Sequence, residues 1–141
     1  MANSESWQAP DKQRLFRYVM EELAGDAHIS FEGNFDGLRL LGIPGAVEEE
    51  TATLKRNTSW PKQDFAVVPL EAGSSETILA AIGGALPRKI IHVQIEKAGL
   101  LLFGAYDQFQ PGCIHFGSTV NRLFLEALVS QGVIGQFPTS R

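Results

Sequence analysis

Cysteine and basic residues are both scarce in this sequence. Cys113 is the only cysteine among 141 residues. It cannot form an intramolecular disulfide, and its isolation excludes a zinc site built from several cysteines. Lys and Arg number 12 against 16 Asp and Glu, which gives a net charge of -4. Proteins that bind nucleic acid normally carry a basic excess, because neutralising phosphates supplies much of their affinity. We therefore expect no nucleic-acid partner.

Long apolar runs and targeting signals are also missing from the sequence. No uncharged apolar run approaches the ~20 residues that a membrane span needs. The first residues, MANSESWQAPDKQ, lack the basic and apolar regions of a secretory signal. The sequence thus predicts a soluble protein in the cytoplasm, without a membrane partner.

Familiar catalytic motifs do not occur. The sequence contains no GxxxxGK[ST] loop, no GxGxxG after a strand, no HExxH and no GxSxG. Gly73-Ser74-Ser75 precedes a predicted helix and can offer free backbone amides to an anion, but a capped helix start is the ordinary interpretation. We predict no cofactor and no metal, and whether the protein is an enzyme stays open.

The composition that is present suits a folded domain. Hydrophobic residues make up 44% and charged residues 20% of the chain, both ordinary for a globular protein. A chain of this length buries roughly 68–70% of the surface that its unfolded form exposes. We expect one domain over residues 1–141, with residues 1–9 flexible.

Periodicity predicts three helices, over residues 11–24, 75–83 and 119–131. The first is the clearest, since its apolar residues recur at helical spacing and Gly25 can end it in a left-handed conformation. The apolar residues of that face are Leu15, Phe16, Val19, Met20 and Leu23. Ser118 is a plausible N-cap for the last helix.

Alternation predicts about six or seven short strands. Four lie at 28–33, 38–41, 51–58 and 64–70, and an antiparallel β-meander runs over residues 89–116. In the meander Ala98-Gly99 turns the chain, residues 100–106 are apolar on both faces, and residues 113–116 return. Strands and helices do not alternate, so we expect an α+β fold with helices packed on an antiparallel sheet.

The meander also suggests a site. A two-residue turn at Ala98-Gly99 pairs Lys97 with Leu100, which places His92 opposite Ala105. A loop over residues 108–112 that pairs Asp107 with Cys113 places His115 opposite Ala105 as well. The two histidines then share a face with their Cα atoms roughly 10 Å apart.

Other side chains join this predicted cluster. Phe103, Asp107 and Cys113 project from the same side, whereas Tyr106 faces the apolar side of the sheet. Two histidines, a carboxylate and a thiol can transfer protons, bind a ligand or supply a nucleophile. A change of one residue in either loop would rotate a histidine to the other face. The structural alternative is that both histidines pack beneath a helix.

Two tryptophans are further candidates for contact with a partner. Trp7 lies in the N-terminal tail, and Trp60 stands beside Pro61, where covering the edge of the core is the ordinary role. We take Phe103 and Trp60 as ligand-binding candidates.

The sequence leaves three functional hypotheses open. The first is a non-enzymatic binding or interaction module, with a homodimer as one version of it, that uses a strand edge or an apolar sheet face. The second is a small hydrolase using His92, His115, Asp107 and Cys113. The third is a subunit that works beside another chain.

Overall fold

The computed structural model describes residues 5–137. Within them, three α-helices accompany a seven-stranded sheet in the order β3-β2-β4-β5-β6-β1-β7, with every neighbouring pair antiparallel. The fold is therefore α+β, as predicted. The elements are β1 Trp7–Gln8, α1 Lys12–Leu23, β2 Ala27–Gly33, the 3-10 helix η1 Leu40–Gly42, β3 Asp64–Leu70, α2 Ser74–Ala81, β4 Ile90–Lys97, β5 Leu100–Ala105, β6 Ile114–Phe116, α3 Arg122–Ser130 and β7 Gly135–Gln136.

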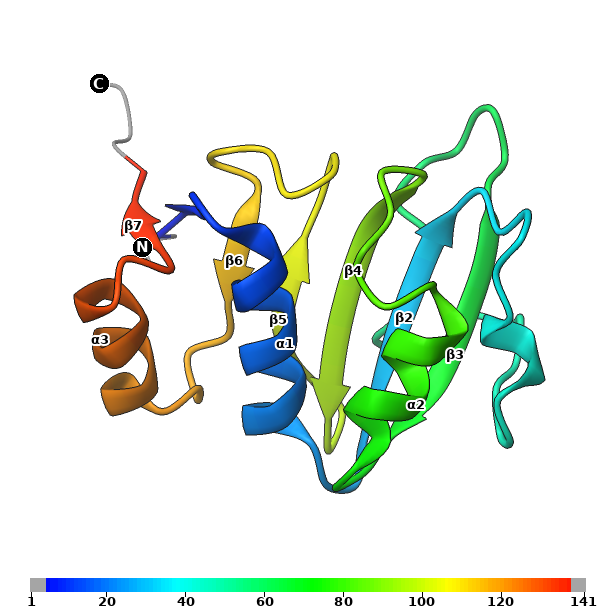
Figure 1. The fold of residues 1–141 in the computed structure, drawn as a ribbon, viewed down its shortest axis with the longest axis horizontal. Coiled ribbons are helices and arrows are strands. Elements are labelled where there is room, and N and C mark those ends of the chain that lie inside the picture. Colours follow the sequence, from blue (N-terminus) through cyan, green and yellow to red (C-terminus); the bar gives the residue numbers. More distant parts are fainter. Residues whose placement is uncertain (1–4, 138–141) are drawn as a thin grey trace.

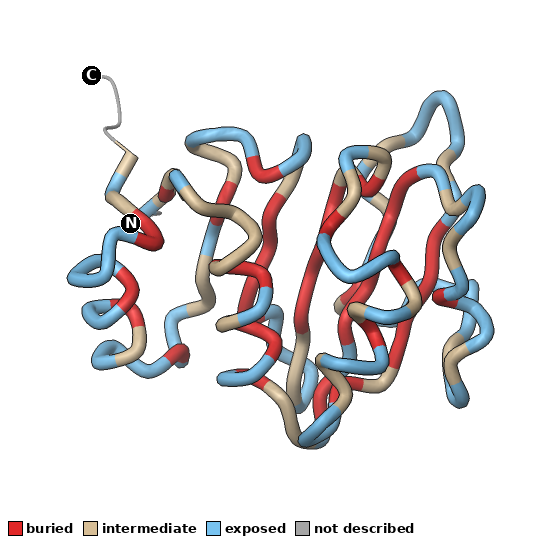
Figure 2. Tube along the Cα trace, in the orientation of Figure 1, coloured by how far each residue is buried: buried red, intermediate tan, exposed pale blue. Residues whose placement is uncertain are grey.

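Helices α1 and α2 cover one face of the sheet, and α3 lies beside β1 and β7 (Figure 1). The predicted apolar face of α1 is buried in full. Phe16 from this face meets Phe31 of β2 edge to face, with ring centroids 6.1 Å apart. Figure 2 shows buried residues concentrated in the central strands and on the sides of the helices that face them. The main core thus lies between the sheet and its helices.

The helix starts differ from the predictions. Helix α3 begins at Arg122, where the Asn121 side chain accepts a hydrogen bond from the Leu123 amide. Ser118 is not the cap, because the chain first makes a turn in which the Val120 amide donates to the Gly117 carbonyl. The predicted termini at residues 119 and 131 are therefore slightly too wide.

Two predicted strands are wrong. Residues 38–41 lead into η1, and residues 51–58 form no strand. We call residues 51–63 the strap. Its threonines make local turns, since the Thr51 hydroxyl accepts hydrogen bonds from the amides of Thr53 and Leu54. Short polar side chains compete in this way with sheet formation.

The N-terminal prediction also needs correction. Residues 1–9 were expected to be flexible, but Trp7 is buried and β1 pairs with both β6 and β7. Residues 1–4 lie outside the described part of the chain. At the other end, Val133 and Ile134 are buried, so the segment after α3 packs on the core.

Both outer strands of the sheet offer little free edge. β3 is bridged along its outer side by Val47, whose amide and carbonyl both bond to Val67 at 3.0 and 2.8 Å. β7 has only two residues. Short or covered edges resist pairing with another chain. In residues 5–137, no helix is both long and apolar enough to cross a membrane.

Candidate functional site

The predicted turn of the meander is confirmed. Lys97 pairs with Leu100, and Ala98 and Gly99 have φ angles of 56° and 79°. Two successive positive φ angles are typical of a tight type I′ hairpin turn. Beyond the turn a β-bulge shifts the register, so that Glu96 pairs with Leu101 but Ile95 pairs with Phe103.

The bulge shifts His92, and the β5–β6 register shifts His115, so the predicted row of histidines is wrong. Ala105 lies opposite Val93 on one side and Ile114 on the other, so neither histidine faces it. His115 pairs instead with Gly104. Each register error is one residue, and the two run in opposite directions along the chain: His92 lies at the level of Tyr106 and His115 at the level of Gly104. Both histidines therefore remain on one face, two residues apart.

Tyr106 occupies the space between the two histidines. Its ring centroid lies 5.6 Å from that of His92 and 6.4 Å from that of His115. The prediction that Tyr106 faces the apolar side of the sheet is wrong. The ring lies over Gly104, where an added Cβ would meet the Tyr106 ring at 2.8 Å. The hydroxyl donates to Gln94 at 3.2 Å, and burial raises the pKa of the phenol.

Phe103 does not belong to this cluster. It lies in the main core, fully buried, and its ring packs against Phe109 and Phe116. It pairs with Ile95, whose side chain points to the helix-covered face. The prediction that Phe103 shares a side with the histidines is therefore wrong, because the bulge moves it to the other face.

His92 is buried and engaged at both ring nitrogens. Nδ1 accepts a hydrogen bond from the Asp107 amide at 3.1 Å, so it carries no proton. The neutral ring then carries its proton on Nε2, 2.7 Å from the Thr58 hydroxyl. With an exposed fraction of 5%, His92 has neither a free nitrogen nor access to a substrate. Its geometry is that of a structural histidine.

Asp107 and Cys113 do come together, as predicted. The Cys113 thiol lies 3.9 Å from Asp107 Oδ2. Partial burial raises the pKa of the thiol, and the neighbouring carboxylate raises it further, because both disfavour the thiolate. The thiolate is the reactive form of cysteine, so this environment works against a nucleophilic role.

Replacing Asp107 with Asn should therefore make Cys113 more reactive. At a fixed pH below the thiol pKa, we expect alkylation to accelerate roughly two- to fivefold, because a lower pKa increases the thiolate fraction. The rate should also begin its rise at a lower pH in the variant. Iodoacetamide labelling followed by mass spectrometry measures both effects, with Cys113→Ser as the unreactive control. Identical pH profiles for the wild type and the Asn variant would contradict the assigned role of Asp107.

His115 is exposed and lines a groove of about 440 Å³. The groove lies between β6 and α3. Its wall includes the buried Trp7 and Leu125, and its rim carries Arg122 and Glu5, whose charged atoms are 3.7 Å apart. Such an exposed ion pair contributes little to stability.

A second hollow, of about 310 Å³, adjoins the groove along α3. It shares Trp7, Arg122 and Leu125 with the groove and adds Val129. Leu123, on the same helix, is 72% exposed. Helix α3 thus presents an exposed aliphatic side chain close to an aromatic and aliphatic hollow.

The two tryptophans have opposite environments. Trp60 is 85% exposed on the strap, so the interpretation that it covers the edge of the core is wrong. Trp7 is buried at 6% exposure and packs edge to face against Phe116, so it is no free anchor for a partner. Of the two ligand-binding candidates, only Trp60 reaches solvent.

Sequence reasoning missed a buried polar network beneath the strap. On the side of the sheet away from α1 and α2, four polar side chains are buried, and we call them the polar face: Ser30, Glu32, His92 and Gln94. Alternation along β2 and β4 does place polar residues there. Nothing in that pattern indicates that residues far along the chain cover them.

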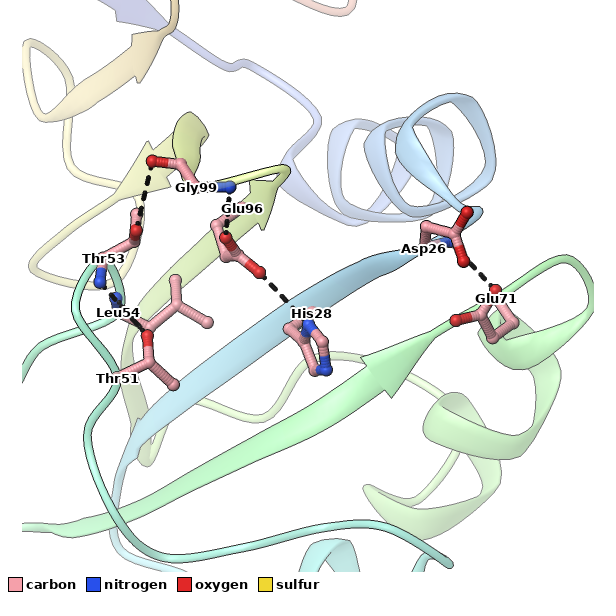
Figure 3. Close-up of polar contacts among 8 residues, drawn as sticks. All are labelled: Asp26, His28, Thr51, Thr53, Leu54, Glu71, Glu96 and Gly99. Carbon is pink, nitrogen blue, oxygen red and sulfur yellow. Dashed lines mark hydrogen bonds and ion pairs between the residues drawn. The ribbon is translucent and has the colours of Figure 1, made fainter.

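The strap joins this face at several points. Leu54, its single buried side chain, packs with Phe65 and Val67 of β3. Near the β4–β5 turn, the Thr53 hydroxyl donates to the Gly99 carbonyl at 3.3 Å (Figure 3). The same view shows Glu96 between the Gly99 amide, from which it accepts a hydrogen bond, and His28. Glu96 Oε2 lies 3.1 Å from His28 Nδ1. His28 is therefore held in a partly exposed cross-strand pair with Glu96.

Within residues 5–137, no three His, Cys, Asp or Glu side chains are grouped so that they could hold a metal ion. Comparison with family models, with curated proteins and with solved structures finds no match to this chain.

Proposed function

We propose that the protein is a non-enzymatic interaction module that pairs with a second copy of itself through α3. The observation that carries this proposal is the exposed Leu123 beside the hollow lined by Trp7, Leu125 and Val129. In a two-fold arrangement each Leu123 enters the hollow of the other copy, since such an interface uses the same patch twice.

Charge on the same helix supports this arrangement. Arg122 and Glu126 both line the hollow and carry opposite charges. A two-fold axis across α3 lets Arg122 of each copy face Glu126 of the other. Pairing through a strand edge has less support, because Val47 already bridges β3 at its central Val67 and β7 is short. We also propose the cytoplasm as the location, where a lone thiol such as Cys113 stays reduced.

The hydrolase hypothesis finds less support in the same contacts. Its two imidazoles would need to converge on an accessible pocket. His115 lines the groove, but His92 is buried with both nitrogens bonded. The Cys113 thiol is also held toward its protonated form.

Leu123→Glu is the variant that tests self-pairing. We expect the wild type to sediment at twice the 15.4 kDa mass of the chain at high micromolar concentration. The Glu variant should sediment as a monomer, because a buried unpaired carboxylate is costly. Leu100→Glu is the matched control, since Leu100 is 52% exposed at the β4–β5 turn, far from α3 in the chain. A monomeric wild type, or equal loss of the dimer in both variants, would refute pairing through α3.

A further inference from the structure

The polar face holds the strap chiefly by its main chain. Gln94 Nε2 donates to the Lys55 carbonyl at 2.8 Å. Glu32 accepts hydrogen bonds from the Asn57 and Thr58 amides at 2.7 and 3.1 Å. His92 adds the contact to the Thr58 hydroxyl. Three of these four contacts use backbone groups that any extended segment can offer.

The strap contributes few side chains of its own to this contact. Leu54 is buried, the Thr58 hydroxyl meets His92, and the Arg56 guanidinium lies over the ring of Phe65 in β3, 5.1 Å from its centroid. Lys55 and Asn57 are exposed. The Lys55 and Asn57 side chains thus add little buried surface. The sheet therefore recognises one aliphatic residue, a guanidinium two residues later, a hydroxyl four residues later and the main chain between them.

Two of the three side chains that hold the strap, Gln94 and His92, are also held by groups outside the strap. Gln94 accepts from the Tyr106 hydroxyl and donates to Ser30 Oγ at 3.2 Å. His92 is oriented by the Asp107 amide. These bonds do not involve the strap. Preorganised groups bind a ligand at lower entropic cost, since they are already ordered.

We propose that the polar face is a peptide-binding surface that residues 54–58 fill in cis. Its partner is an extended segment of another protein, with an aliphatic residue in the place of Leu54, Arg in the place of Arg56 and Ser or Thr in the place of Thr58. This partner displaces the strap and takes over its bonds to Glu32, His92 and Gln94. The inference does not depend on pairing through α3, which uses other residues.

The covalent tether explains how the strap regulates this surface. A tethered segment competes at an effective concentration in the millimolar range. A segment in trans binds the wild type weakly for that reason. Loosening the strap weakens the competitor and raises the affinity for a segment in trans.

The test uses the full chain and a fluorescein-labelled peptide with the sequence of residues 51–59, TATLKRNTS. Leu54→Ala loosens the strap by removing its buried side chain, and the peptide resupplies the leucine. We expect the peptide to bind this variant at least about tenfold more tightly than the wild type in fluorescence anisotropy. A second variant, Asn57→Pro, removes one amide donor to Glu32 and changes only an exposed strap residue, so it does not depend on the stability of Leu54→Ala.

Matched controls separate peptide recognition from nonspecific adhesion. A peptide with Val in the place of Thr58 loses the hydroxyl contact and should bind several-fold more weakly. Adding Glu32→Gln to the Asn57→Pro variant removes a carboxylate oxygen and should weaken binding likewise. If folded Leu54→Ala and Asn57→Pro proteins bind the peptide no better than the wild type does, the polar face serves only to hold the strap in place, and the proposal fails. Equal binding of the Val peptide would also overturn it.

Discussion

Replacing Glu32 with alanine should lower the free energy of unfolding by about 3 kcal/mol, among the largest losses for one polar side chain. Glu32 is 1% exposed and accepts the amide hydrogens of Asn57 and Thr58. The alanine variant leaves both amides without their acceptor and opens a cavity beneath the strap. Chemical denaturation followed by circular dichroism measures the loss.

A second readout links that loss to the strap. The amides of Asn57 and Thr58 should exchange with solvent faster in Glu32→Ala, because their acceptor is gone. Amides in the centre of β4 should keep the same ranking of exchange rates among themselves as in the wild type. Glu32→Gln is the matched control, since it keeps the volume and one acceptor oxygen and should cost roughly half as much. Unchanged exchange at Asn57 and Thr58 would show that these amides do not depend on Glu32.

The parts of the fold that follow from local periodicity could be predicted from the sequence. In α1, five apolar residues at helical spacing identify both the helix and its buried face. The β4–β5 hairpin follows from alternation on one strand and from Ala98-Gly99 at the turn. Each of these features depends on residues that are close together in the chain.

The register of the meander could not be predicted for a specific reason. Leu100, Leu101, Leu102 and Phe103 are all apolar, so the pattern does not indicate which side chains face the core. The bulge occurs within this run, between the pairs Ile95–Phe103 and Glu96–Leu101. It sends Phe103 into the core and brings Tyr106 between the histidines.

The structure of the strap could not be predicted from nearby residues for a different reason. Its threonines resemble a strand, yet the acceptors for its amides lie 25 and 26 positions earlier in the chain, on Glu32. Only the pairing of β2 with β4 brings Glu32 opposite His92. The candidate site was thus partly predicted: His92 was named, but its role in holding the strap depends on contacts between distant segments.

Replacing Gly33 with alanine should lower the free energy of unfolding at least as much as Glu32→Ala does, because the added Cβ would collide with backbone atoms. A Cβ on Gly33 would lie within 2.2 Å of the Lys89 carbonyl oxygen and 2.9 Å of Ile90 Cα. The Asn34 amide donates to that same carbonyl, and the register between β2 and β4 shifts at this residue. In the alanine variant, β2 and β4 must therefore move apart at this end of their pairing. We expect a loss of more than ~3 kcal/mol, since overpacking against backbone cannot be relieved by a rotamer change.

Gly42→Ala provides the control for this substitution. No atom lies within 4 Å of a Cβ added at Gly42, so the same chemical change meets open space. Its denaturation midpoint should stay close to that of the wild type. Because Gly33 directly follows Glu32, separation of β2 from β4 also disturbs the polar face, and the Asn57 and Thr58 amides should lose protection together with those of β4. A Gly33→Ala protein as stable as Gly42→Ala would mean that β2 and β4 do not approach as closely as the contact at Lys89 requires.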